Sequence, residues 1–438
     1  MAWAHTLGRP ASGGVGRIAG LSPRQAAART APDAGRARKE ARAAWFSVTA
    51  AVNAGFVAWS AGHGGAGSRA VQWSLAAFCI GVAARHDGIV RAVFVLGRLV
   101  PSYRLHQLTY HLGQLHRAMA MAGLAWLTAG AALAAASSLA AAIASAGVLA
   151  ILVMVARTAR DRVRQARHNR FETIHRLGGW TALGILAVLV PAEAARSLPP
   201  GAGLAGLVHQ PTVLLMAVLI VLVAHPWLGV RRRRAEFLAV TGEVVVVALP
   251  GRRRLGEFVR ISRDGREWHS FAVATTGAEG TGRYCLVIRR AGDWTERLAS
   301  DAEHGRAPAR LWVRRMRGYG FMYHAQAYRR VLMVATGAGI GPVLPYLLGR
   351  PAVTFECLWI GRSHRAAMGT DLVDRVLAGG SVTLIDTSHG RPDVGACVAD
   401  MAHRFEAVFV VSNDAVRDSV ARACEASGIP WYGPTFDS

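Results

Sequence analysis

Lysine and closely spaced cysteines are nearly absent from this sequence of 438 residues. Lys39 is the one lysine, so the formal net charge of +24 comes almost entirely from arginine. Such a bias is typical of a GC-rich genome, and we expect no nucleic-acid partner from it. No C-x-x-C spacing occurs among the five cysteines, which excludes a disulfide framework and a zinc site of that kind. The cysteines are Cys79, Cys285, Cys357, Cys397 and Cys424.

Residues 1–42 lack the apolar core that a cleavable signal peptide needs. This segment is rich in glycine, alanine and arginine and holds few acidic residues. We therefore expect a mobile basic tail on the cytoplasmic side.

Hydrophobic residues make up 52% of the chain, which excludes the disordered and collagen-like classes of protein. They gather in long uncharged runs within residues 43–230, whereas residues 235–438 mix charged and apolar residues as soluble domains do. A helix needs about 20 apolar residues to cross a bilayer. One stretch, 70–84, is short and could continue into the amphipathic stretch 89–100. The stretches that meet or approach the required length are 43–61, 115–136, 138–156, 174–195 and 211–229.

The distribution of arginine decides whether the short stretch also crosses, because cytoplasmic loops collect positive charge. If it crosses, the loops on the outer side hold only Arg69 and Arg196 as basic residues. If it does not, the arginine-rich loop 157–171 and the run Arg231–Arg234 lie on opposite sides. We therefore predict a six-helix transmembrane domain over 43–230 in a bacterial-type inner or plasma membrane. Both the N-terminus and the C-terminal half would be cytoplasmic.

Histidines near the predicted helix ends allow two interpretations. They are interfacial residues that bond lipid headgroups and loop carbonyls, or they hold a haem iron between two helices. His111 and His116 point roughly 140° away from each other on a helix, so both cannot face one partner. Two stacked haems would need histidines about four turns apart on each of two helices, and that spacing is absent. At most one haem is predicted, between His111 or His116 and His175.

The C-terminal half divides into two patterns. Short alternating or apolar runs, broken by glycine and charged turns, predict a small antiparallel β-barrel over 235–327. Regular alternation of strands and helices over 328–438 predicts a doubly wound parallel α/β sheet. The expected strands are 236–249, 257–262, 268–274, 284–290 and 310–315 in the barrel, and 331–335, 353–361, 381–386 and 407–412 in the sheet. The fold class is thus an α-helical membrane bundle followed by an α+β module.

A glycine-rich turn, T-G-A-G-I-G-P over residues 336–342, lies between the first strand of the predicted parallel sheet and a helical stretch, 343–348. Glycines let the backbone approach a pyrophosphate closely, and the start of a helix offers free N–H groups and a positive dipole. The turn therefore predicts nucleotide binding. The residues expected at the ligand are Thr336, Gly337, Gly339, Gly341 and Pro342.

Three motifs resemble the ferredoxin-NADP reductase superfamily, and within it the membrane flavoproteins of the ferric-reductase and NADPH-oxidase type. Residues 267–272 (EWHSFA) resemble the flavin-binding EWHPFT strand, and residues 289–295 (RRAGDWT) resemble the IRxxGDWT segment. Residues 337–342 are similar to the glycine-rich pyridine-nucleotide loop that ends in proline. The order of the motifs also agrees with that family.

This resemblance implies FAD and NADPH as cofactors. His269 and Phe271 would line the FAD, Arg289 would neutralise its pyrophosphate, and the turn 292–295 would supply backbone N–H donors. Ser412 would stand beside the nicotinamide, and Phe436 would cover the flavin ring. The implied FAD contacts are together Trp268, His269, Ser270, Phe271, Arg289, Gly292, Trp294 and Thr295.

The sequence also departs from the family pattern. Ser270 replaces the proline, and Ala272 replaces the hydroxyl residue that hydrogen-bonds the flavin. Residues 410–413 (VVSN) stand where the family has a Cys-Gly pair beside the nicotinamide. The paired haem histidines of ferric reductases are absent as well, which puts transmembrane electron transfer in doubt.

Basic and hydroxyl residues that follow the strand 353–361 favour NADPH over NADH. Arg362 and Ser363 suit a 2′-phosphate, whereas an NAD site would place an acidic residue on the ribose. Arg391 lies in a segment similar to the family's G-R-P segment and would add a second cation.

Together these features predict an integral membrane oxidoreductase that passes electrons from NADPH through FAD to an acceptor in or at the membrane. The acceptor would be a small molecule or a lipid. One alternative is a haem-containing transmembrane ferric reductase or oxidase. The other is a nucleotide-sensing or scaffold membrane protein without turnover.

Overall fold

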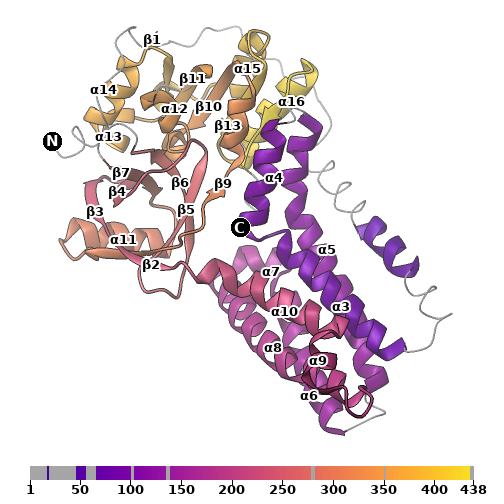
Figure 1. Cartoon of the computed structure of the whole chain (residues 1–438). Coiled ribbons are helices and arrows are strands. Elements are labelled where there is room, and N and C mark those ends of the chain that lie inside the picture. The colour runs from indigo at the N-terminus through magenta and orange to yellow at the C-terminus, as the bar shows by residue number, and fades with distance from the viewer. Residues whose placement is uncertain are drawn as a thin grey trace. The chain divides into compact units, whose positions relative to one another are not determined.

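The computed structural model describes residues 17–18, 46–55, 66–99, 103–134, 139–277, 282–349 and 352–434. These residues form two compact units (Figure 1). The helical unit contains the described part of Ala37–Ile89 together with His111–Leu228. The sheet unit contains the described parts of Met1–Arg36, Val90–Tyr110 and Gly229–Ser438.

Helices that pack side by side through small residues form the helical unit. Gly178 faces Val155 so closely that a Cβ at this glycine would lie 2.8 Å from the valine side chain. A Cβ at Gly123 would similarly lie 2.7 Å from the Phe78 ring. The helices are residues 46–55, α3 (Ala66–Ala83), α5 (Tyr103–Ala134, from His111 on), α6 (Leu139–Thr158), α7 (Asp161–Ala166), α8 (His168–Arg196), α9 (Gly203–Val208), α10 (Pro211–Ala224) and the 3₁₀ turn η1 (His225–Trp227).

Two helices in the described part of the chain, α6 and α8, are long and apolar enough to cross a membrane. Two further apolar helices, Arg69–Ala83 and Pro211–Trp227, are shorter. A buried core helix of a soluble protein can pass the same test of length and composition. The prediction of six spans is therefore not established, and part of its first stretch, 43–61, lies outside the described residues.

The amphipathic stretch 89–100 does not continue the short apolar stretch before it. A turn at residues 84–86 ends α3, and α4 (Asp87–Leu99) begins as a separate helix. From Val90 onward α4 belongs to the sheet unit, where Phe94 packs among Tyr319 and Tyr323. The apolar face of α4 is thus partly covered by protein.

The barrel part of the sheet unit is antiparallel, with strand order β2-β8-β5-β6-β7-β4-β3 and β9 paired to β5. Helix α11 (Asp293–Glu303) follows β7. The strands are β2 (Arg231–Arg234), β3 (Glu236–Val240), β4 (Val244–Pro250), β5 (Glu257–Ser262), β6 (His269–Thr275), β7 (Arg283–Arg289), β8 (Arg310–Val313) and β9 (Gly318–Tyr319).

Three details of the barrel differ from the sequence-based expectation. The run 236–249 is two strands, because the Thr241 hydroxyl accepts the backbone N–H groups of Glu243 and Val244 and turns the chain. The strand expected at 310–315 ends at Val313. The run Arg231–Arg234 forms a strand that its composition did not suggest, since it pairs with β8.

The second part of the sheet unit is a parallel sheet with strand order β1-β12-β11-β10-β13-β14. Strands β10 to β13 agree with the predicted alternation of strands and helices, whereas β1, within the predicted tail 1–42, and β14 were not predicted. Its strands are β1 (Arg17–Ile18), β10 (Arg330–Thr336), β11 (Thr354–Gly361), β12 (Val382–Asp386), β13 (Ala407–Val411) and β14 (Trp431–Tyr432). Its helices are η2 (Phe321–Ala327), η3 (Gly337–Ile340), α12 (Leu344–Leu348), α13 (His364–Met368), α14 (Thr370–Ala378), η4 (Thr387–His389), α15 (Val394–Ala402) and α16 (Asp414–Ala426).

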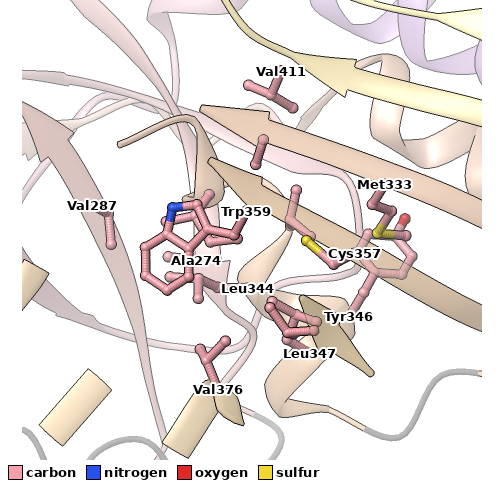
Figure 2. Packing of buried hydrophobic residues seen from close by; sticks show 14 of the residues in the cluster. Ala274, Val287, Met333, Leu344, Tyr346, Leu347, Cys357, Trp359, Val376 and Val411 are labelled. Atoms are coloured by element: carbon pink, nitrogen blue, oxygen red, sulfur yellow. The ribbon is translucent and has the colours of Figure 1, made fainter. Parts of the chain in front are cut away.

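One cluster of buried hydrophobic residues joins the barrel to the parallel sheet. Strand β4 explains how, because its alternate residues face opposite ways and both faces are buried. Val245 and Val247 pack inside the barrel, whereas Val244 and Val246 pack against residues of the parallel sheet. Figure 2 shows Val287 of the barrel beside Trp359 of the sheet within this core.

Candidate functional site

The strand order of the parallel sheet creates a switch point at β10. From β10 the chain crosses to β11 and β12 on one side, then returns to β13 on the other side. Two neighbouring crossovers therefore leave the sheet in opposite directions at the carboxyl ends of β10 and β13. In open α/β sheets this is where ligands bind.

The glycine-rich turn occupies the switch point. Residues Gly337–Ile340 form the 3₁₀ turn η3 directly after β10. Gly337 has a φ of +50°, which favours glycine. A Cβ at Gly339 would lie 2.5 Å from the Val411 carbonyl oxygen, so only glycine fits against β13. Gly341 lies next to Val287 of β7, which brings the turn into contact with the barrel.

Two side-chain hydrogen bonds hold the turn in place. The buried Trp359 indole donates from Nε1 to the Gly337 carbonyl oxygen over 3.0 Å. The hydroxyls of Thr336 and Ser412 lie 2.8 Å apart, at the ends of β10 and β13. The structure thus brings the predicted nicotinamide residue, Ser412, next to the predicted nucleotide turn. Pro342 follows that turn, and Phe436 lies outside the described residues.

The end of β11 carries the residues predicted to select NADPH. Arg362 and Ser363 are both exposed, and Ser363 has a left-handed φ of +47°. Asp386, at the end of β12, is paired in register with Gly361. Hydrogen bonds from the backbone and side chain of Ser388 hold the pKa of Asp386 below its usual value. A carboxylate at this edge was not foreseen, and it opposes the preference for a 2′-phosphate that Arg362 favours. Arg391 is exposed in the loop before α15.

Three predicted FAD residues form an aromatic cluster on the barrel. The ring centroids of His269 and Trp294 are 4.6 Å apart, and those of Phe271 and Trp294 are 5.8 Å apart. Glu267 Oε1 lies 2.9 Å from His269 Nε2 and orients the imidazole. Because His269 and Phe271 are two residues apart on β6, both side chains lie on one face of this strand.

Other residues of the predicted FAD set have different neighbours. Trp268 donates from its indole to the Gly265 carbonyl oxygen, and the Arg314 guanidinium lies 4.9 Å from its ring. Ser270 accepts a hydrogen bond from Arg260 on β5. These two side chains take part in turn and strand contacts, so the structure groups them apart from the aromatic cluster.

The segment predicted to meet the FAD pyrophosphate is the start of α11. Gly292 is the residue before the helix, and Thr295 Oγ1 accepts the Ala291 N–H and donates to the Gly292 carbonyl. Arg290 is tied to Glu296, Glu303 and the Thr241 carbonyl. The Arg289 side chain is exposed at the end of β7, where it can meet an anion.

In the helical unit the structure brings two of the three candidate haem histidines together. The rings of His116 and His175 lie 6.2 Å apart, and His116 Nδ1 is 2.8 Å from the Gly81 carbonyl oxygen. His111 lies five residues before His116 on the same helix. Among the described residues no group of three or more His, Cys, Asp or Glu side chains could hold a metal ion. Two axial imidazoles suffice for a haem iron, so the pair remains compatible with haem.

A buried histidine pair behind the parallel sheet was missed by sequence reasoning. His324 of η2 stacks between His106 of α5, at 4.2 Å, and Phe94 of α4, at 4.6 Å. Burial and the neighbouring His106 lower the pKa of His324 to about 3. Neither histidine carries a sequence signal, because each follows from contacts between distant segments.

His106 belongs to a chain of hydrogen bonds. Its Nε2 lies 2.8 Å from the Gly97 carbonyl and must donate to it, so its Nδ1 accepts from the Tyr432 hydroxyl at 2.6 Å. The Tyr328 hydroxyl, also 2.6 Å away, then donates to Tyr432. This chain joins α5 to the last strand of the sheet.

The known proteins that this chain is similar to in sequence are named as reductases. Residues 321–438 match the family described as adenylate-forming reductase 03009, C-terminal domain. The chain is also 30% identical over 381 residues to adenylate-forming reductase 06235 of Coprinopsis cinerea, and 30% identical over 384 residues to adenylate-forming reductase 03009 of that fungus. Each alignment covers 82% of this chain and 36% of the relative. The chain thus spans 36% of the length of these curated relatives, which are named as reductases but not as ferric reductases.

Solved structures give a weaker likeness. Phthalate dioxygenase reductase is 16% identical, with a TM-score of 0.37, and the match covers 47% of this chain and 67% of that one. The ferredoxin reductase in carbazole 1,9a-dioxygenase is 16% identical, also with a TM-score of 0.37, over 47% of this chain and 70% of that one. A likeness of this size supports no conclusion about this chain.

Proposed function

We propose that this chain is a flavin-dependent oxidoreductase that takes electrons from NADPH and passes them through FAD to an acceptor in or at a membrane. The observation that carries the proposal is the switch point, where the glycine-rich turn, Ser412 and the barrel strand β7 meet. The sequence similarity to proteins named as reductases supports it.

The residues at the switch point fit a dinucleotide. Nothing lies within 4 Å of a Cβ position at Gly337, so a pyrophosphate can approach the backbone there, whereas Gly339 and Gly341 pack the turn against β13 and β7. Trp359 prevents the turn from shifting, and the Thr336 and Ser412 hydroxyls supply donors at the edge where a nicotinamide would lie. When bound, the nicotinamide and flavin would supply hydride transfer, and the protein would orient the two rings and exclude water.

The barrel fits a flavin in part. The half-buried His269 and Phe271, which pack on the buried Trp294, offer aromatic surface, and the exposed Arg289 guanidinium offers a partner for a diphosphate. Ala272 offers no hydroxyl, so the flavin would lack one side-chain hydrogen bond that the resembling family provides. We expect weaker FAD binding as a consequence.

Exposed apolar side chains support a place in the bilayer for the helical unit. In the apolar part of α6, 17% of the residues are buried, whereas the core helix of a soluble protein is mostly buried. Val188 of α8 and Ile143 of α6 are among the large apolar side chains exposed on this unit. Exposed large apolar side chains on several helices of one unit favour contact with lipid or another protein. Localisation in a cytoplasmic membrane remains part of the proposal.

An absorption spectrum of the detergent-purified full chain tests this function. We expect a flavin spectrum, after FAD is supplied if necessary, that bleaches when NADPH is added without oxygen. NADH should be compared in parallel, because Asp386 and Arg362 favour opposite nucleotides. A chain that binds nucleotide but never bleaches would overturn the oxidoreductase and support a nucleotide sensor. A chain that binds neither FAD nor nucleotide would refute both functions.

A haem-containing reductase is the second candidate, and the ring contact between His116 and His175 favours it. The same spectrum would then show a Soret band that shifts on reduction. His175→Ala should abolish that band, whereas His209→Ala, which removes an exposed histidine bonded to the Ala205 carbonyl, should leave it intact. A wild-type spectrum without a Soret band, recorded after haem is supplied during expression, would exclude this candidate.

A further inference from the structure

Four consecutive arginines form the edge strand of the barrel. Arg231–Arg234 constitute β2, which stands at the end of the strand order and pairs with β8 alone. All four residues are exposed. Because successive side chains of a strand point to opposite faces, positive charge covers both faces of this edge.

The strand is electrostatically self-repelling. Arg234 stands directly opposite Arg310 of β8, a like-charge pair that destabilises a sheet. Arg232 lies over the Trp312 ring at 5.4 Å, which holds its guanidinium but does not neutralise it. Among the described residues no carboxylate forms an ion pair with any of the four. Residues on the same face of the strand are two positions, about 7 Å, apart, which is within the screening length of about 8 Å, so a counter-anion would relieve the repulsion.

Chain connectivity brings this charge close to the end of the apolar helices. Four residue steps separate Trp227, the last residue of η1, from Arg231, and they span at most about 14 Å. Within the helical unit the Trp227 ring lies 6.4 Å from that of Trp180, and Leu228 is 81% exposed. Tryptophan pairs followed by basic residues are typical of the boundary between a bilayer and water.

We propose that β2 is a binding site for anionic phospholipid headgroups, which would serve as the counter-anions of Arg231–Arg234. This inference rests on the part of the proposed function that places the helical unit in a bilayer. A guanidinium fork matches a phosphate in bidentate geometry, and four forks on two faces of one strand can engage several headgroups at once. Basic residues near an anionic leaflet attract its headgroups, so a cluster of four favours anionic lipid over neutral lipid.

Protection of the edge strand against aggregation is a weaker explanation of the same residues. A single inward charge, a bulge or a proline suffices for that purpose. Four like charges without acidic partners add repulsion that such protection does not need. An anionic surface accounts for the excess.

Lipid retention by the full chain tests the site. The detergent-solubilised protein is reconstituted into nanodiscs of equal parts phosphatidylglycerol and phosphatidylcholine, then stripped gently, and the retained lipids are quantified by mass spectrometry. We expect the ratio of phosphatidylglycerol to phosphatidylcholine among the retained lipids to be about five times the ratio in the disc, and this enrichment to fall as salt is raised. Replacement of Arg231–Arg234 by glutamine should abolish it, whereas replacement by lysine should retain most of it.

A matched control variant distinguishes a specific lipid site at β2 from a general effect of the protein's net charge. Neutralising Arg306, Arg329, Arg404 and Arg422, arginines on other elements that are exposed or half-buried, removes the same charge and should leave the enrichment unchanged. Equal loss in both glutamine variants, or no enrichment in wild type, would overturn the proposal. Displacement of the lipid by inorganic phosphate at low millimolar concentration would also overturn it, by assigning the strand to free anions.

Membrane integration is measured separately, so that the two proposals can fail independently. If alkaline carbonate does not extract the wild-type protein but no anionic lipid is enriched, the headgroup site is wrong and the bilayer placement stands. If carbonate releases the protein, the bilayer placement fails, and the headgroup site fails with it.

Discussion

At the scale of single residues, the glycine-rich turn depends on the absence of one methyl group. Gly339 lies against the carbonyl of Val411, and the two strand ends meet here without space for a side chain. The turn and β13 therefore form one rigid surface. On the other side of the turn, Trp359 of the neighbouring strand β11 donates a hydrogen bond to the Gly337 carbonyl oxygen.

Gly339→Ala should disrupt nucleotide binding, because its Cβ would lie 2.5 Å from the Val411 carbonyl oxygen and must displace the turn. We expect NADPH affinity, measured by calorimetric titration of the full chain, to fall at least about tenfold, which corresponds to about 1.4 kcal/mol. Gly242→Ala is the control, since nothing lies within 4 Å of a Cβ there. Unchanged affinity in Gly339→Ala would show that the ligand does not use the turn.

His324 should make stability depend on pH. Its ring is 1% exposed, and burial beside His106 lowers its pKa from the ordinary 6.5 to about 3 in the folded chain. Between these two pH values the unfolded chain binds a proton that the folded chain does not. The free energy of unfolding should therefore fall as the pH is lowered from 6.5 towards 3, by up to about 1.4 kcal/mol per pH unit from this group.

The measurement for His324 is the free energy of unfolding across this range of pH in the wild type and in two variants. His324→Phe keeps an aromatic ring between Phe94 and His106 but cannot take up the proton, so its slope should be shallower. His304→Ala, which removes an exposed histidine, should keep the wild-type slope. Parallel curves for wild type and His324→Phe would contradict the assignment.

At the scale of elements, α4 shows how an amphipathic helix can be assigned to the wrong neighbour. Its pattern suggested an extension of a membrane span, yet Phe94 stacks on His324 and packs with Tyr319 and Tyr323 of the sheet unit. The first turns of α5 have a similar role, since Tyr103 donates to the Trp431 carbonyl. Both elements stabilise the last strand of the parallel sheet and its surroundings.

Phe94→Ala should destabilise the sheet unit. Removing this buried ring leaves a cavity among aromatic side chains, for which a loss of about 3–5 kcal/mol is typical. Thermal unfolding of the full chain in detergent, followed by near-ultraviolet circular dichroism, should show the transition of the sheet unit at lower temperature. Leu96→Ala on the same helix, at a position that is 58% exposed, should shift it little. Equal shifts would show that α4 does not pack as described.

At the scale of the whole molecule, the open question is what covers the apolar helices. The helical unit exposes large apolar side chains along α6, α8 and α10. A charged substitution on such a surface distinguishes lipid from water. In water it is nearly neutral for stability, whereas in the middle of a bilayer it costs about 2.5–3.5 kcal/mol.

Val188→Asp should therefore reduce the fraction of protein recovered in membranes, because Val188 is 71% exposed in the second half of α8, within the predicted span 174–195. Leu204→Asp is the matched control, since Leu204 is 75% exposed on the short helix α9 in a predicted loop. The measurement is the ratio of membrane-bound to soluble protein after fractionation. A soluble, folded Val188→Asp protein indistinguishable from the Leu204→Asp protein would argue against a bilayer.

The sequence alone determined the features that local chemistry controls. The change from long apolar runs to short strands after residue 235, the alternation of strands and helices after residue 328, and the glycine-rich turn at 336–342 all follow from the period of side chains and the freedom of glycine. Most strands of the barrel and the parallel sheet lie where these patterns predict them.

Only the tertiary structure decided which distant residues meet. Arg231–Arg234 is a strand because β8 pairs with it, and His324 is buried because α4 and α5 fold over it. Ser412 reaches Thr336 because β13 lies beside β10. Each contact joins segments far apart in the chain, so no local periodicity encodes it. Pairing and burial, rather than local propensity, determined the neighbours of each of these residues.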